Sequence, residues 1–239
     1  MKLTKTTKRN KARHAQNRKT EAGNVFLFIL LGIVLFATLS YIMSRGFRTT
    51  GTDQISDRRA ELAATEIMNF SQRVERAISK TRSKGISEND ISLEHNGNFI
   101  NANCDDAADA EFPTCQIFNP AGGRVTAITP PDGANDGTAW HYTGTTCIES
   151  NVDTNCETDT VSNEELLMIL PNVRENVCRF INNKLNITGI PTATGTYSGT
   201  AFTGSFADGS EIIIASGPHD TACYSDGTNY HFYYTLMKR

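Results

Sequence analysis

An uncharged and mostly apolar run at residues 24–43 constrains this chain more than any other feature of its sequence. Thirteen of these 20 residues are Leu, Ile, Val or Phe. A helix of this length is about 30 Å long, which matches the hydrocarbon thickness of a bilayer. A buried core helix is the alternative, but soluble domains rarely contain a helix that is apolar on every side. The run therefore predicts a transmembrane helix at residues 24–44.

Charge is distributed unevenly around this run. Residues 1–23 contain eight Lys or Arg and one acid, whereas the rest of the chain contains 15 bases and 25 acids. Basic flanks of membrane helices stay in the cytoplasm, so we expect a single-pass protein with a basic cytoplasmic leader and an external head. A nucleic-acid-binding arm is the other interpretation of the basic run, but its position beside an apolar segment favours a role in topology.

Cysteines occur only beyond the apolar run. An even number of them in an exported domain indicates disulfides. Cys104 and Cys115 enclose ten residues, and Cys147 and Cys156 enclose eight, so we expect each pair to close a local loop. Cys178 and Cys223 would then pair by elimination, although six cysteines leave fifteen connectivities open. No Cys-x-x-Cys pair is present, which disfavours zinc and thioredoxin-like chemistry. The six are Cys104, Cys115, Cys147, Cys156, Cys178 and Cys223.

The N-terminus follows the pattern of a known export signal. A long basic leader ends in Ala22-Gly23, and the apolar run begins at once with Asn24. This pattern resembles the class III signal of type IV pilins and type II secretion pseudopilins. The resemblance implies cleavage by a prepilin peptidase between Gly23 and Asn24, methylation of the new N-terminus, and a periplasmic or extracellular head held by the inner membrane. It also implies assembly with other pilin-like subunits through the N-terminal helix.

Phe28 is a departure from that family, because most of its members carry a glutamate at the fifth mature position. The difference favours a minor or accessory subunit of a pilus or pseudopilus-like filament over a major one.

An ordinary secretory signal, cut near Ser40, is the alternative for the leader.

Residues 45–85 are predicted to form a linker and then an amphipathic helix. Glycine and threonine at residues 49–52 predict a break or a loosened turn. Apolar residues then recur at helical spacing until Gly85, so one face should pack on the protein's own sheet, with a surface for a partner helix as the alternative. These apolar residues are Ile55, Leu62, Ile67, Phe70, Val74 and Ile78.

Residues 86–239 are predicted to form an α+β head, and the family resemblance implies a pilin-like one with an antiparallel sheet. Helices are expected at residues 162–170 and 173–185, where Ser162 and Glu165 resemble a capping box. Strands are expected at residues 116–118, 125–128, 211–215 and 230–237, where β-branched and aromatic residues gather between turn signals.

A weak calcium-binding pattern is the main candidate for chemistry in the head. Five oxygen-bearing residues occupy positions 1, 3, 5, 7 and 12 of a loop of the EF-hand type, which suits Ca²⁺. Thr158 replaces the glycine at the sixth position, and Cys156 lies within the loop, so a solvated acidic loop is the other interpretation. The five candidates are Asp153, Asn155, Glu157, Asp159 and Glu164.

No cofactor motif or catalytic arrangement is recognisable, so we expect a structural protein and not an enzyme. Beyond Gly85 the chain has 6 bases and 20 acids, and this balance disfavours binding of nucleic acid. Two alternatives remain open from the sequence: an uncleaved, signal-anchored periplasmic protein with a binding or sensor head, and an envelope hydrolase.

Overall fold

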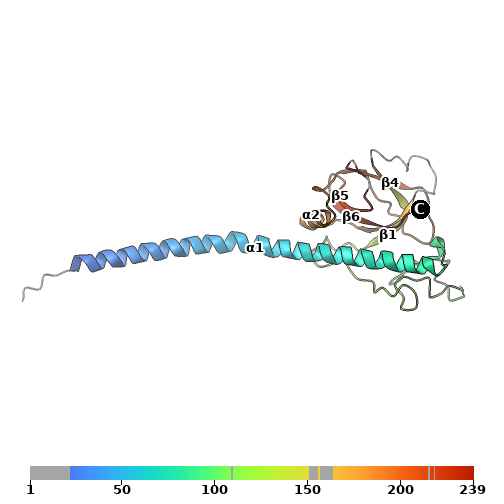
Figure 1. Ribbon diagram of the computed structural model, residues 1–239, viewed down its shortest axis with the longest axis horizontal. Helices are drawn as coiled ribbons and strands as arrows, with labels where there is room; N and C mark the ends of the chain where they lie inside the picture. The colour runs from blue at the N-terminus through green and yellow to red at the C-terminus, as the bar shows by residue number, and fades with distance from the viewer. Residues whose placement is uncertain (1–21, 109, 151–155, 157–163, 215, 218) are drawn as a thin grey trace, which may run out of the picture. The chain divides into compact units, whose positions relative to one another are not determined.

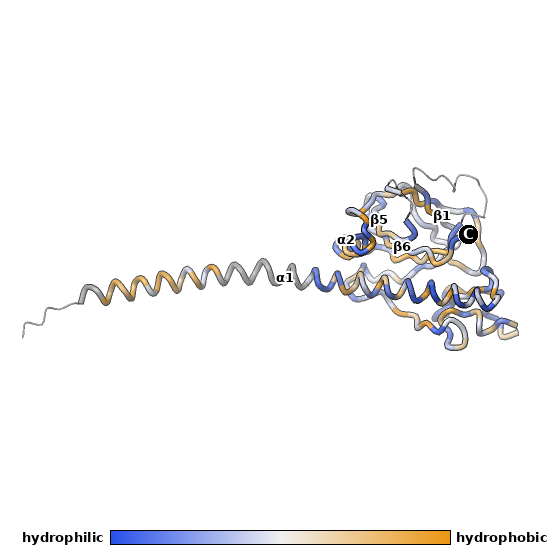
Figure 2. Tube along the Cα trace, viewed as in Figure 1, coloured by the Kyte–Doolittle hydropathy of each residue, from blue (hydrophilic) through white to orange (hydrophobic). Residues whose placement is uncertain are grey.

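The computed structural model describes residues 22–108, 110–150, 156, 164–214, 216–217 and 219–239 (Figure 1). Two compact units divide the chain, one ending at Asp53 and the other beginning at Gln54. Helix α1 covers Ala22–Ser83, and residues 49–52, where a break was expected, are helical. In the first unit, the part of α1 from Val25 to Ile42 is long and apolar enough to cross a membrane by length and composition (Figure 2).

The second unit is an α+β head that is organised around the C-terminal part of α1. The buried residues of this part recur every three or four positions, which confirms the predicted amphipathic helix. Leu62 is an exception, because its side chain is 69% exposed and lies outside the packed face. Tyr234 of the sheet donates a hydrogen bond to Glu75 of α1 (Oη to Oε2, 2.6 Å). The buried apolar residues are Ala60, Ala63, Ala64, Ile67, Phe70, Val74, Ala77 and Ile78.

The sheet of the head has six strands in the order β3-β4-β1-β2-β6-β5. Strands β1 and β4 are parallel, whereas the other described pairings are antiparallel, so the sheet is mixed and the expected antiparallel sheet is wrong in this respect. The strands are β1 (His141–Ser150), β2 (Glu165–Leu170), β3 (Ala193–Gly195), β4 (Ser210–Ile214), β5 (Thr221–Ser225) and β6 (Tyr230–Met237).

Strand β2 lies inside the sheet and is buried on both faces. Leu166, Met168 and Leu170 belong to the core that also contains the packed face of α1. Leu167 and Ile169 belong to a second apolar cluster on the other face, together with residues of β4 and β5. Such a strand reads as a continuous apolar run. The helix predicted at residues 162–170 is therefore wrong where the structure describes the chain.

The remaining elements agree in part with the sequence analysis. Helix α2 (Glu175–Lys184) confirms the predicted second helix, and β4 and β6 confirm the two C-terminal strands. A short 3₁₀ helix, η1, covers Glu88–Asp90. The strands expected at residues 116–118 and 125–128 are not formed, since residues 124–131 belong to no helix, strand or turn and Gln116 makes only an isolated bridge with Ser92.

Candidate functional site

The apolar segment of α1 presents its side chains outward on all sides. Among its large apolar residues the exposed fraction ranges from 49% for Leu30 and Val34 to 75% for Phe36. Thr38 satisfies its own hydroxyl within the helix, donating a hydrogen bond to the Leu35 carbonyl oxygen (2.9 Å). A Cβ placed on Gly32 would meet no atom within 4 Å, so another helix has room to approach closely there. This surface needs lipid or other helices to cover it.

The predicted processing residues, Gly23 and Asn24, lie in the first turn of α1. The leader before Ala22 lies outside the described residues. The backbone is therefore helical directly after the expected cleavage point, and the apolar surface begins at Val25.

The head contains three disulfides, and their pairing is the predicted one: Cys104–Cys115, Cys147–Cys156 and Cys178–Cys223. The first two close short loops, with sequence separations of 11 and 9 residues. The third joins α2 to β5 across a separation of 45 residues. Disulfides stabilise mainly by restricting the unfolded chain, and longer loops gain more.

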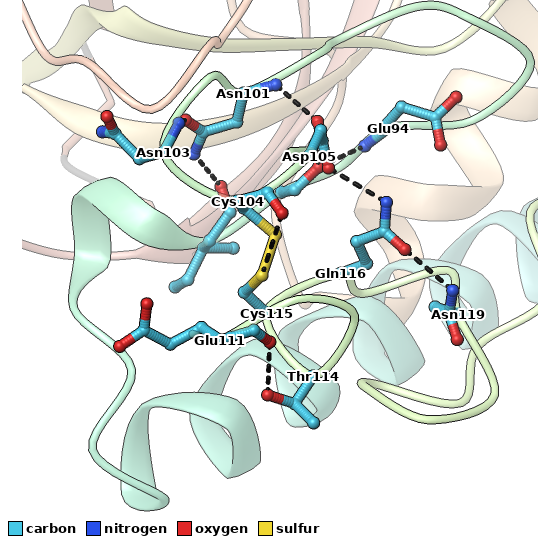
Figure 3. The surroundings of a disulfide bond; sticks show 12 residues. Glu94, Asn101, Asn103, Cys104, Asp105, Glu111, Thr114, Cys115, Gln116 and Asn119 are labelled. Atoms are coloured by element: carbon cyan, nitrogen blue, oxygen red, sulfur yellow. Dashed lines mark hydrogen bonds between the residues drawn. A yellow bond between two sulfur atoms is a disulfide. The ribbon is translucent and has the colours of Figure 1, made fainter. Parts of the chain in front are cut away.

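Asp105 organises the loop that follows the first cysteine (Figure 3). Its Oδ2 accepts hydrogen bonds from the Ser92 hydroxyl (2.9 Å) and from the Asn101 N–H (2.6 Å). Its Oδ1 accepts a hydrogen bond from the Gln116 amide (3.0 Å). The loop between Cys104 and Cys115 is therefore fixed to the head by the Asp105 carboxylate, a role that the sequence did not predict.

Four of the five calcium candidates, Asp153, Asn155, Glu157 and Asp159, lie outside the described residues. The fifth, Glu164, is buried, with 4% of its surface exposed, and its Oε2 has no hydrogen-bond partner among the described residues. No group of three His, Cys, Asp or Glu residues suited to a metal ion occurs within the described ranges. The calcium hypothesis thus gains no further ligand from the part of the chain that the structure covers.

Burial and neighbouring charges act together on Glu164. Burial has the larger effect, and the negative charges of Asp208, Glu165 and Glu211 add to it, so that the pKa of Glu164 rises to about 7. Burial likewise raises the pKa of Glu165 to about 7, against the hydrogen bond that its carboxylate accepts from the Ile148 N–H. The start of β2 therefore holds two neighbouring carboxyl groups that gain protons near neutral pH.

These raised pKa values predict a pH-dependent stability. A carboxyl group with a raised folded-state pKa binds its proton more tightly in the folded protein, so its stabilising effect is complete below about pH 4.5 and is lost as the pH rises through about 7. We expect Glu164→Gln to raise the free energy of unfolding at pH 8 by about 1–3 kcal/mol, since one pKa unit corresponds to about 1.36 kcal/mol. At pH 5 the variant should match the wild type more closely.

Urea unfolding of the full chain in detergent micelles at pH 5, 6, 7 and 8 measures this effect. Asp132→Asn, which removes an exposed carboxylate, is the control and should follow the wild-type profile. Parallel profiles for Glu164→Gln and the wild type would contradict the assignment of the pH dependence to Glu164.

The histidines of the head contact mainly backbone, carboxylate and aromatic groups. His141 Nε2 lies 3.0 Å from the Ser198 carbonyl oxygen, and burial lowers the pKa of His141. His231 Nε2 lies 3.0 Å from Asp226 Oδ2. The Ser216 hydroxyl lies 3.4 Å from His219 Nε2 in an exposed turn. Within the described contacts, no carboxylate orients His219, so these residues do not form a relay of the Ser-His-Asp kind.

In comparisons with known proteins, no family model, curated protein or solved structure matches this chain.

Proposed function

We propose that this protein is a structural subunit, minor or accessory, of a type IV pilus or of a filament like the type II secretion pseudopilus. The observation that carries the proposal is the segment from Val25 to Ile42, whose apolar side chains are exposed around the whole helix. It follows a junction, Gly23-Asn24, that resembles a prepilin peptidase site. Burial of this segment among similar helices would supply the driving force for assembly.

The amphipathic part of α1 packs within the head, which leaves assembly to the N-terminal segment. From Ala60 to Ile78, its apolar face is already covered within the head, with Phe70 packing against Trp140 (ring centroids 5.4 Å apart). This face is therefore not available to a partner helix. Contacts with other pilin-like subunits are left to the uncovered N-terminal segment.

Localisation follows from charge and from the disulfides. The basic leader favours a cytoplasmic N-terminus, so the head lies on the other side of the inner membrane, in the periplasm or beyond it. Three disulfides suit that oxidising compartment. Phe28, in place of the usual glutamate, favours an accessory position in the filament.

Processing of the leader is the direct test. In cells with a prepilin peptidase, we expect mass analysis of the purified protein to show a chain that starts at Asn24. Gly23→Leu should leave almost all of the protein uncut, because the resemblance makes Gly23 the last leader residue. Ala22→Ser, which changes the neighbouring position only slightly, should still be cut.

A wild-type chain that keeps Met1 in the membrane fraction would contradict this function. It would favour the alternative of an uncleaved, signal-anchored periplasmic protein with a binding or sensor head. Cleavage near Ser40 would instead indicate ordinary secretion.

A further inference from the structure

One segment of the head has the sequence of a strand but no strand partner. We call residues 124–131 the strap. Val125 donates its N–H to the Ile117 carbonyl oxygen (3.3 Å), but the backbone N–H and C=O groups of residues 126–129 make no hydrogen bond within the part of the chain that the structure describes. Four of its eight residues are Val, Thr or Ile, which favour strands. The strap therefore offers a run of backbone groups that no described strand pairs.

The strap runs beside α1, on the side of the helix away from the sheet (Figure 1). Hollows lie along both of its sides. One, of about 640 Å³, separates it from His95 and Phe118. A second, of about 380 Å³, separates its residues Val125, Thr126 and Ile128 from α1. An added chain thus has room to lie next to the free backbone groups.

The second hollow is strongly basic, and we call it the basic groove. Arg73, Arg76 and Lys80 of α1 line it together with Arg124 of the strap. None of the four forms an ion pair with a described carboxylate. Arg76 and Arg124 use their Nε atoms on backbone carbonyl oxygens, at 3.0 and 3.2 Å, which leaves the outer guanidinium N–H groups for a ligand.

These cations gather in a head that is acidic as a whole, since residues 54–239 contain 24 acids and 13 bases. Arg124 also adopts a left-handed backbone conformation, with φ of 62°, as the chain leaves the turn before the strap. A carboxylate is the ligand that a guanidinium group holds with two parallel hydrogen bonds. Charge complementarity therefore favours an acidic ligand.

The spacing of the cations suits an extended peptide. Arg73 and Lys80 are seven positions apart, or about 10 Å along a helix, which equals about three residues of a strand. Side chains on one face of a strand recur about every 6.6 Å. Two carboxylates at alternate positions of a strand would therefore both lie within reach of the three cations of α1.

We propose that the strap and the basic groove form a docking site for an extended acidic peptide segment of a partner protein, which adds as a strand along residues 126–129. Backbone hydrogen bonds to the strap give affinity, and alternating carboxylates contact Arg73, Arg76, Lys80 and Arg124. This site is independent of leader cleavage and of the proposed filament function.

Fluorescence anisotropy tests the charge requirement, with the full chain in detergent micelles and a labelled octapeptide in which Glu alternates with Val or Thr. We expect saturable binding that weakens as salt rises. The triple variant Arg73→Gln, Arg76→Gln, Lys80→Gln should bind at least tenfold more weakly. The control triple variant Arg58→Gln, Arg174→Gln, Arg179→Gln removes three exposed charges elsewhere and should bind within twofold of the wild type.

Strand pairing is tested with two forms of the peptide that are N-methylated at alternate residues. Because N–H groups of a strand alternate between its two edges, one form should lose at least tenfold in affinity and the other should bind nearly as well as the parent. Absence of binding at 1 mM peptide would overturn the proposal. The proposal would also be overturned if both methylated forms bound equally well, if a peptide with Lys in place of Glu bound as well as the acidic one, or if the two triple variants lost equal affinity. If both methylated forms bound and dextran sulfate displaced both, the basic groove would be a general anion-binding surface.

Discussion

Replacing both Leu31 and Leu35 with arginine is expected to remove this protein from the membrane fraction. An arginine at the centre of a membrane helix costs about 2.5–3.5 kcal/mol, and the leucine that it replaces contributes about 0.3–0.6 kcal/mol, so the double variant loses about 6–8 kcal/mol. The apolar residues of the whole segment supply a similar total. Insertion therefore becomes unfavourable, and assembly through this helix should fail with it.

Fractionation and carbonate extraction of cells that express the full chain measure this effect. Leu31→Ala with Leu35→Ala is the matched control, because it keeps the segment uncharged and should stay in the membrane. Leu62→Arg places an arginine at an exposed leucine of α1 outside the segment and should also stay there. Carbonate-resistant membrane attachment of the double arginine variant would show that residues 25–42 are not the anchor.

The sequence was most informative where one strong pattern decided the structure. Residues 25–42 are recognisable from the sequence as a candidate membrane helix because no charge interrupts them. The packed face of α1 is predictable because its apolar residues recur at helical spacing. The cysteine pairs at separations of 11 and 9 residues were predictable because nearby cysteines close loops readily. Strand β6 was predictable from its aromatic and β-branched residues.

Other elements depend on contacts that are remote in sequence. The sequence predicts a helix where strand β2 forms, because a short apolar run that is buried on both faces has no period of its own. The parallel pairing of β1 with β4 joins segments about sixty residues apart, for example Cys147 with Glu211, and nothing in either segment indicates it. The strap has the composition of a strand, but only the fold shows that none of the described strands pairs with it.

The candidate sites also depend on contacts between residues that are far apart in the sequence. Glu164 is a calcium-ligand candidate from its place in a loop of the EF-hand type, whereas the structure shows a buried carboxyl group near the charges of Glu165, Asp208 and Glu211. Two of those neighbours come from the β4 region, far along the chain. The basic groove likewise joins Arg124 to α1, and no local pattern links these residues. The junction at Gly23-Asn24 stays a prediction from the sequence.

Removal of the Cys178–Cys223 disulfide by replacing both cysteines with alanine is expected to lower the free energy of unfolding of the head by about 4 kcal/mol. The chain-entropy model gives this value for a loop of 45 residues, against about 3 kcal/mol for the loop of 11 residues between Cys104 and Cys115. Both cysteines of the long loop are fully buried. The midpoint of thermal unfolding should fall by about 10 °C.

The head should nevertheless keep its fold, because Asn182 holds the same junction between α2 and β5. Its buried amide donates hydrogen bonds to the carbonyl oxygens of Gly189 (2.9 Å) and Cys223 (2.8 Å), and its Oδ1 accepts one from the Cys223 N–H (2.8 Å). Thermal unfolding of the full chain in detergent, beside a Cys104→Ala, Cys115→Ala control, measures the difference between the two loops. A smaller loss for the long loop than for the short one would contradict the entropic account, and six titratable thiols in the purified wild type would contradict the disulfides themselves.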